Sequence, residues 1–266
     1  MQPGQFLERS VVVRSGELVL DGLFHRGARA PACAIAAPHP ALGGSMAVPV
    51  INELAWALTR AGHATLRFDY RGVGASQGTS RHLADLDSLP PRITPASVAG
   101  EVEDLLAAID QLRATVRGEG EGALAERPVC AIGYSFGACV ALAARADPRV
   151  ERLVLVAPPT RLGELEAIGA VEKPLLVVCA QQDGLSDREQ LRKWMDPLGD
   201  LAKLEVIAHA DHVFRRGLPE LGRLVAGWLR GGAPLPEAAR AEEGRAEEPF
   251  VELELEEGPA LELDEG

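Results

Sequence analysis

A serine between two glycines stands where an apolar run of the chain gives way to a helix-forming run, in the sequence GYSFG at 133–137. The run 128–132 is β-prone, and the alanine- and leucine-rich run 138–146 favours a helix. At a sharp strand-to-helix turn the outer glycines avoid clashes, and the serine hydroxyl is exposed above the sheet. We therefore predict Ser135 as a nucleophile, with the Phe136 N–H as one donor to a developing oxyanion. The alternative interpretation is that Ser135 is only a small residue suited to a tight turn.

Two further polar residues follow predicted strands and can serve as partners of Ser135. Asp183 comes three residues after the apolar run 175–180, and His212 comes four residues after the run 204–208. Because parallel strands place their carboxyl ends at one edge of a sheet, we expect these side chains to meet there. His212 would then take the proton from Ser135, while Asp183 fixes the imidazole tautomer and stabilises the imidazolium.

Each of these assignments has rivals close by in the sequence. Asp187 falls within a predicted helix over 185–195, so we prefer Asp183 as the orienting acid. His209 lies nearer the end of its strand than His212 does, and we interpret it as a structural or turn residue. Asp211 is interpreted as shaping the loop before His212.

The second oxyanion donor is expected in the loop at 38–44, because it follows a predicted strand and cannot be regular structure. Pro40 has no N–H, so we predict Ala41 as the donor and keep Leu42 as the alternative. His39 stands between two prolines, and we interpret it as a brace for the loop rather than as a base or a metal ligand.

The elements that must position these residues alternate between strand and helix along residues 1–230, which we predict to form one domain. This alternation predicts an α/β fold with a mostly parallel sheet and helices on both faces. The predicted strands are 11–13, 18–24, 32–37, 63–69, 128–132, 150–157, 174–180 and 202–208, and the predicted helices are 46–61, 96–117, 138–146, 185–195 and 218–229. The first two strands are expected to form a hairpin.

Four segments in this order resemble the small lidless bacterial α/β-hydrolases, which are related to the dienelactone hydrolases and the prolyl oligopeptidase-type hydrolases. They are PHP…GGSM at 38–46, LRFDYRGVGAS at 66–76, GYSFG at 133–137 and ADHVF at 210–214. The resemblance covers about residues 6–230. It implies the α/β-hydrolase fold, with a sheet of about eight strands whose second strand is antiparallel, and the order Ser, Asp, His found here is the one expected of this superfamily.

The same resemblance implies that Asp69, Arg71 and Gly72 are structural parts of a turn with no catalytic role. One departure is Ala180, which stands where relatives often have a glycine before the triad acid. Many relatives carry a cap domain, but the short connection 158–173 predicts that none is present here. Only the loop at 79–94 is a further candidate to cover the predicted active site, which would otherwise be open to solvent.

Composition limits the range of partners. The net charge of −12 is uneven: residues 231–266 hold twelve acids and two arginines, a net −10, which leaves −2 for residues 1–230. A nearly neutral domain predicts no nucleic-acid surface. No apolar run is long enough to span a bilayer and no signal-peptide pattern is present, so we expect no membrane partner and a cytoplasmic location.

The four cysteines, Cys33, Cys130, Cys139 and Cys179, form no C-x-x-C pair, and we expect buried, inert thiols with no metal or other cofactor. In the acidic tail, residues 250–264 contain a run in which apolar and acidic residues alternate. That pattern fits either a disordered tail or a strand that docks on a basic protein partner.

These observations predict a serine hydrolase of the carboxylesterase type, which cleaves a carboxylic ester or related small acyl derivative through an acyl-enzyme. Acyl transfer by the same residues is one alternative. A non-catalytic interaction protein that keeps the fold is another. The substrate depends on the loops at 40–48, 79–94 and 158–172, whose shape the sequence leaves open.

Overall fold

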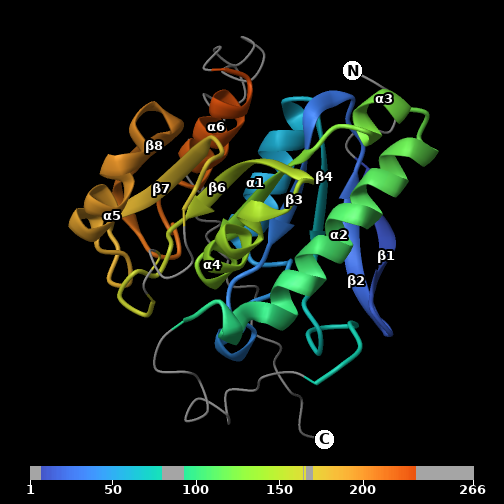
Figure 1. The fold of residues 1–266 in the computed structure, drawn as a ribbon, viewed down its shortest axis with the longest axis horizontal. Helices are drawn as coiled ribbons and strands as arrows, with labels where there is room; N and C mark the ends of the chain where they lie inside the picture. The colour runs from blue at the N-terminus through green and yellow to red at the C-terminus, as the bar shows by residue number, and fades with distance from the viewer. Residues whose placement is uncertain (1–6, 80–92, 164, 166–169, 232–266) are drawn as a thin grey trace, which may run out of the picture. The chain divides into compact units, whose positions relative to one another are not determined.

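A single sheet of eight strands runs through the computed structural model, which describes residues 7–79, 93–163, 165 and 170–231 (Figure 1). The spatial order is β1-β2-β4-β3-β5-β6-β7-β8. The strands are β1 (Arg9–Ser15), β2 (Leu18–His25), β3 (Arg29–Ala36), β4 (His63–Phe68), β5 (Val129–Tyr134), β6 (Val150–Val156), β7 (Leu175–Gln182) and β8 (Ala202–Asp211). β2 is antiparallel to both of its neighbours, and β3 to β8 are parallel. The expected hairpin, antiparallel second strand and mostly parallel sheet are confirmed.

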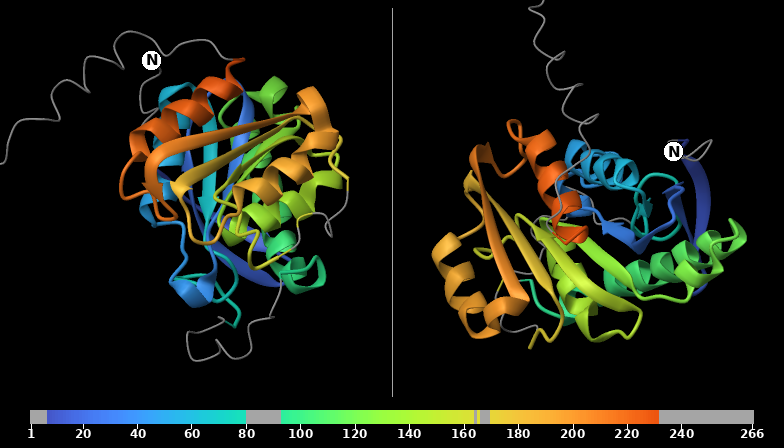
Figure 2. Two further views of the ribbon diagram at one scale, coloured as in Figure 1. Left: turned by 90° about the vertical axis from the view of Figure 1, so that its left-hand side faces the viewer. Right: turned by 90° about the horizontal axis from the view of Figure 1, so that it is seen from above.

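Helices cover both faces of this sheet (Figure 2). α1 and α6 pack on one face, and α2, α4 and α5 pack on the other. Because both faces are covered, the central strands are apolar along nearly their whole length, as the sequence shows for β5 and β7. The helices are α1 (Pro49–Arg60), α2 (Ala99–Gly118), α3 (Gly122–Ala125), α4 (Phe136–Ala143), α5 (Arg188–Met195) and α6 (Leu218–Leu229).

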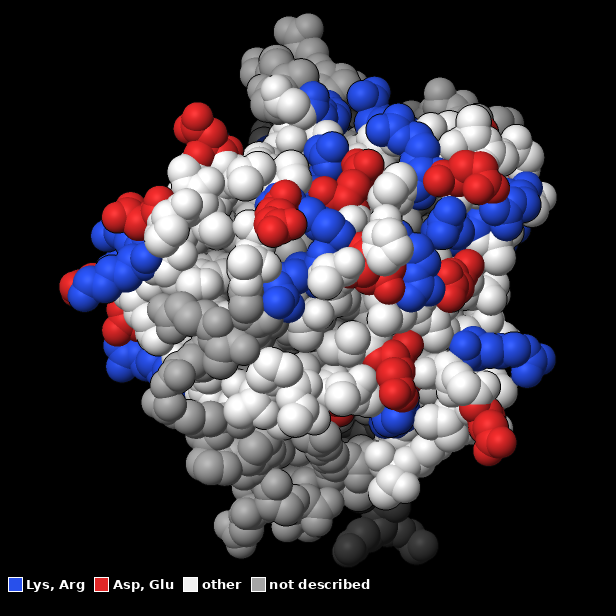
Figure 3. Space-filling model, viewed as in Figure 1, with Lys and Arg blue, Asp and Glu red and all other residues white. Residues whose placement is uncertain are grey.

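On the face of the molecule shown in Figure 3, basic and acidic side chains lie next to one another. Many of them form ion pairs. Arg149, for example, bonds Asp110 at 2.6 Å and Asp147 at 2.7 Å. The described surface on this face therefore shows interspersed charge and no broad field of one sign.

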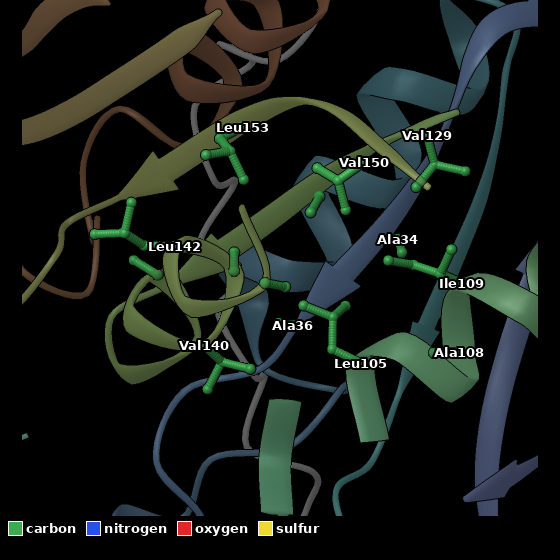
Figure 4. Packing of buried hydrophobic residues seen from close by; sticks show 14 of the residues in the cluster. Ala34, Ala36, Leu105, Ala108, Ile109, Val129, Val140, Leu142, Val150 and Leu153 are labelled. Carbon is green, nitrogen blue, oxygen red and sulfur yellow. The ribbon is translucent and has the colours of Figure 1, made fainter. Parts of the chain in front are cut away.

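The core is split by the sheet into two apolar layers. Figure 4 shows one of them, where Ala34 and Ala36 of β3 lie near Leu105 and Ile109 of α2. Small side chains on the strand leave room for the large ones on the helix, so the two layers approach closely. All four cysteines are free and buried within these layers, as expected, and burial raises the pKa of the Cys139 thiol to about 12.

Several element boundaries differ from those expected, and three of them have a clear structural description. The helix expected over 46–61 begins at Pro49, since proline suits the first turn of a helix. The helix expected over 185–195 begins at Arg188, and Asp187 is its N-cap, so the expectation that Asp187 lies inside the helix is wrong. The strand expected over 202–208 continues to Asp211.

Some expectations concern residues outside the described ranges. These include most of the 79–94 loop and, apart from Gly231, the acidic tail at 231–266, which stays a prediction. Among the helices that are described, none combines the length and the apolar character needed to cross a membrane.

The buried His63 at the start of β4 gives a prediction about stability. Burial lowers the pKa of His63 from its ordinary 6.5 to about 4, and its Nδ1–H donates to the Pro31 carbonyl at 2.9 Å. Between these two pKa values the unfolded chain binds a proton that the folded chain does not, so stability falls as the pH falls. From pH 7 to pH 5 this histidine should cost about 2 kcal/mol in the free energy of unfolding.

The measurement is urea unfolding at both pH values in wild type and in His63→Asn, which keeps a donor near Pro31 but cannot titrate. The variant should lose less stability on acidification than wild type does. An equal loss in both proteins would show that His63 is not the group responsible.

Candidate active site

Ser135 sits at the turn between β5 and α4 with a backbone conformation that side chains rarely adopt. Its φ is 54° and its ψ is −120°, and its N–H donates to the Val156 carbonyl of β6 at 2.8 Å. A positive φ at a non-glycine residue stores strain that the surrounding packing must hold. The turn therefore fixes the position of the serine hydroxyl at the carboxyl end of the sheet.

The glycines of the GYSFG sequence are required by close backbone contacts. A Cβ at Gly133 would lie 1.9 Å from the Gly137 carbonyl oxygen. A Cβ at Gly137 would lie 2.4 Å from the Ala36 carbonyl oxygen and 2.5 Å from that of Ala37. The first contact closes the turn on itself, and the second packs α4 directly against the end of β3.

Replacing Gly137 with alanine should therefore destabilise the protein by about 3 kcal/mol, the upper end of the range for overpacking, because backbone atoms cannot move aside as a flexible side chain can. The matched control is Gly118→Ala at the end of α2, where a Cβ meets nothing within 4 Å. Thermal unfolding of both variants checks this. A Gly137→Ala protein as stable as Gly118→Ala would contradict the close contact.

Ser135, His212 and Asp183 are brought into one chain of hydrogen bonds. The Ser135 Oγ lies 2.9 Å from His212 Nε2, and His212 Nδ1 lies 2.9 Å from each carboxylate oxygen of Asp183. Ser135 follows β5, Asp183 follows β7 and His212 follows β8, so all three meet at the carboxyl edge of the sheet. The arrangement allows a proton to pass from the serine to the imidazole.

The electrostatics of Asp183 favour its charged form. Its carboxylate is 1% exposed, and this burial pushes its pKa upward. The bond to His212 and the N–H groups of Leu185 and Ser186, at 2.8 and 3.1 Å, outweigh the burial and hold the pKa of Asp183 below its ordinary value. An ionised Asp183 can accept the Nδ1–H of His212.

Two of the rival residues, Asp187 and Asp211, make other hydrogen bonds, and the third, His209, is exposed. The Asp187 carboxylate accepts the N–H groups of Glu189 and Gln190 as the cap of α5. Asp211 accepts the Arg215 N–H at 3.0 Å, which shapes the loop after His212. His209 is exposed at the outer strand with a φ of 57°. None of these contacts reaches Ser135.

Tyr134 is a further residue of the site that no pattern in the sequence indicates. Its hydroxyl donates to the His212 carbonyl at 3.0 Å, and its ring packs at an edge-on angle against Phe214. Burial raises the pKa of Tyr134 well above its ordinary value, so the hydroxyl stays protonated and donates. Tyr134 therefore ties the loop that carries the histidine to the residue before the serine.

The predicted oxyanion donors lie on two elements. The Phe136 N–H is in the first turn of α4, where a helix offers no backbone acceptor. In the short helical turn η1 (Pro40–Leu42), the Ala41 N–H donates to His39 Nδ1 at 3.1 Å and the Leu42 N–H donates to the His39 carbonyl at 3.0 Å. Ala41 and Leu42, the two candidates for the second oxyanion donor, thus both donate their N–H to His39. Either N–H must give up that hydrogen bond in order to bind an oxyanion.

His39 packs edge-on against Phe136, with ring centroids 4.6 Å apart, so it braces the β3 loop against the serine turn. Asp69 holds the same loop from the other side, by accepting the Met46 N–H at 2.7 Å. Arg71 bonds the fully buried Asp104 of α2 through its backbone N–H and its guanidinium. These contacts agree with the structural roles expected for Asp69 and Arg71.

Among the described residues, no three His, Cys, Asp or Glu side chains gather as metal ligands.

Comparison with known proteins agrees with the fold. Residues 43–171 match the family model described as serine aminopeptidase, S33. An α/β serine hydrolase homologue from Coxiella burnetii is 28% identical, superposes with a TM-score of 0.64, and matches 85% of this chain and 97% of its own. The chain has the α/β-hydrolase fold.

Two further solved structures share this fold. XC6422 from Xanthomonas campestris, an α/β serine hydrolase without a lid, is 23% identical with a TM-score of 0.62, over 85% of this chain and 93% of its own. A dienelactone hydrolase from Anabaena variabilis is also 23% identical with a TM-score of 0.62, over 85% and 98%. The expected resemblance and the expected α/β-hydrolase fold are therefore confirmed.

Proposed function

We propose that this α/β-hydrolase cleaves a carboxylic ester, or a related acyl derivative, through an acyl-enzyme formed on Ser135. The observation that carries the proposal is the hydrogen-bonded chain from Ser135 through His212 to Asp183. A serine, an imidazole and a buried carboxylate in this order supply a nucleophile, a base and an orienting acid. The family match to α/β serine hydrolases supports the same reaction class.

In the first half of the reaction the Ser135 oxygen bonds to the ester carbonyl carbon, and its proton passes to His212 Nε2. The negative oxygen of the tetrahedral intermediate is held by the Phe136 N–H and by a second N–H, for which we retain Ala41. The intermediate collapses as the carbon–alkoxide bond breaks, and the alkoxide takes the proton from His212. Water then repeats the sequence on the acyl-serine, which releases the acid and restores the serine.

The surroundings of Ser135 favour a substrate with an exposed ester and an apolar part. Leu42, Leu162 and Val213 are 59%, 40% and 46% exposed in the loops that follow β3, β6 and β8. These loops leave the carboxyl edge of the sheet, where Ser135 also lies. An apolar group placed against them is removed from water. The Anabaena neighbour is named for action on a lactone, which is a cyclic ester.

Covalent labelling tests the proposal most directly. A fluorophosphonate probe should label wild type at Ser135 and leave Ser135→Ala unlabelled, and wild type should hydrolyse p-nitrophenyl acetate. Folded wild type that neither reacts with the probe nor cleaves the ester would favour a non-catalytic interaction protein. Addition of alcohol or amine acceptors separates the remaining alternative, since an acyltransferase would yield mainly the transferred product.

A further inference from the structure

A hollow of about 320 Å³ lies beside Asp183, between the loop after β6, the end of β7 and the start of α5. Three basic side chains line it: Arg161 from the β6 loop, and Arg188 and Arg192 from α5. The hollow borders the candidate active site, because Asp183 lines it and also bonds His212. Nothing in the proposed reaction uses these arginines.

The acidic side chains around this hollow already have partners. Asp183 bonds His212 and two N–H groups, and Asp187 caps α5. Glu189 pairs with Lys193 at 2.9 Å, on the outer turn of the helix. Asp183 and Glu189 therefore have partners other than the three arginines, while the charge of Arg161 also contributes to the lowered pKa of Asp187.

The guanidinium groups of Arg161, Arg188 and Arg192 make no hydrogen bond or ion pair with any side chain in the described ranges. Arginines elsewhere in the protein do, as Arg71 with Asp104 and Arg149 with Asp147 show. Arg188 and Arg192 stand one helical turn apart on α5, so their side chains lie on one face of the helix. Arg161 lines the same hollow from the loop that follows β6. Its backbone N–H donates to the Leu185 carbonyl at 3.1 Å, which holds this loop beside the start of α5.

We propose that this hollow is a binding site for a carboxylate or phosphate group. Guanidinium groups bind planar oxyanions through paired N–H donors, and three of them around one hollow offer more donors than a single anion needs. The hydroxyl of Ser186 is not among these donors, because it donates to the Pro158 carbonyl at 2.7 Å. The anion is either a free ligand or a group carried by the substrate of the neighbouring serine.

Direct binding tests the site without any need for turnover. Isothermal titration with inorganic phosphate and with succinate, at low ionic strength, should give saturable binding to wild type. The double variant Arg188→Gln/Arg192→Gln should bind at least tenfold more weakly. The matched control, Arg14→Gln/Arg127→Gln, removes two exposed arginines that lie outside the hollow and should bind as wild type does.

Absence of saturable binding to wild type, or an equal loss in both double variants, would overturn the proposal. Circular dichroism melting of each variant excludes misfolding as the cause of a loss. Because the titration involves no catalysis, a wild type that binds the anion but cleaves no ester would contradict only the proposed function.

Steady-state kinetics then distinguish the two sources of the anion. This second experiment rests on the proposed function, because it requires ester cleavage. If the substrate carries the anion, the Arg188→Gln/Arg192→Gln variant should raise KM at least fivefold for p-nitrophenyl hydrogen succinate. It should leave KM for p-nitrophenyl acetate unchanged. If the anion is a free ligand, the two esters should respond alike while phosphate binding is still lost.

Discussion

Replacing Ser135 with alanine should lower the turnover of a simple ester by about 10⁴-fold or more. The hydroxyl that lies 2.9 Å from His212 Nε2 is the group that would bond to the substrate carbon, and alanine offers no substitute. The remaining rate would come only from binding and the oxyanion donors, because the three residues act as a unit. Turnover of p-nitrophenyl acetate by purified wild type and variant checks the prediction.

Ser10→Ala is the matched control, since it removes an exposed hydroxyl from the edge strand β1. It should leave turnover unchanged. Comparable turnover in Ser135→Ala and wild type would contradict the assignment of the nucleophile, and would direct the search to another residue.

Replacing Asp183 with asparagine should lower the turnover number by about 10⁴-fold while the fold is retained. The Leu185 and Ser186 N–H groups both donate to Asp183 Oδ1, so in the variant they keep the amide oxygen on that side. The amide NH₂ is then left facing His212 Nδ1, which must accept. The proton moves to Nε2, and the imidazole can no longer take the serine proton.

Asp187→Asn is the control for this second prediction, because asparagine also serves well as an N-cap and α5 should stay intact. Its turnover on a neutral ester should remain within about twofold of wild type, since its contacts do not reach Ser135. The opposite result, a large loss in Asp187→Asn and none in Asp183→Asn, would transfer the acid role to Asp187. Steady-state kinetics of both variants decide between them.

Much of the fold can be predicted from local patterns in the sequence. Apolar runs such as 175–180 are short and β-prone because both faces of their strand are buried, and this feature needs no knowledge of the neighbours. The boundaries are less accessible. Asp187 falls inside the helix expected over 185–195, whereas in the structure it is the N-cap, a position that aspartate favours. β8 continues to Asp211, past the end expected at 208, through a His209 whose backbone is left-handed, a conformation that the sequence does not display.

The proposed site separates into a part that sequence order predicts and a part that depends on tertiary contacts. Ser135, Asp183 and His212 each follow a parallel strand, so topology alone brings them to one edge. The bond of Tyr134 to the His212 loop joins residues far apart in the chain, and an aromatic residue before a serine is no specific signal. The gathering of Arg161 with Arg188 and Arg192 likewise needs adjacent strand ends, which only the sheet order shows.

The backbone contact between Gly137 and the carbonyl groups at the end of β3 has a consequence for how this protein can change over evolutionary time. It positions the serine turn and the start of the His39 loop through main-chain atoms, which most substitutions leave in place. Leu42, Leu162 and Val213, by contrast, present exposed side chains at the rim. Substitutions at these three exposed residues can therefore change which substrates bind, while the geometry of the serine turn is inherited unchanged.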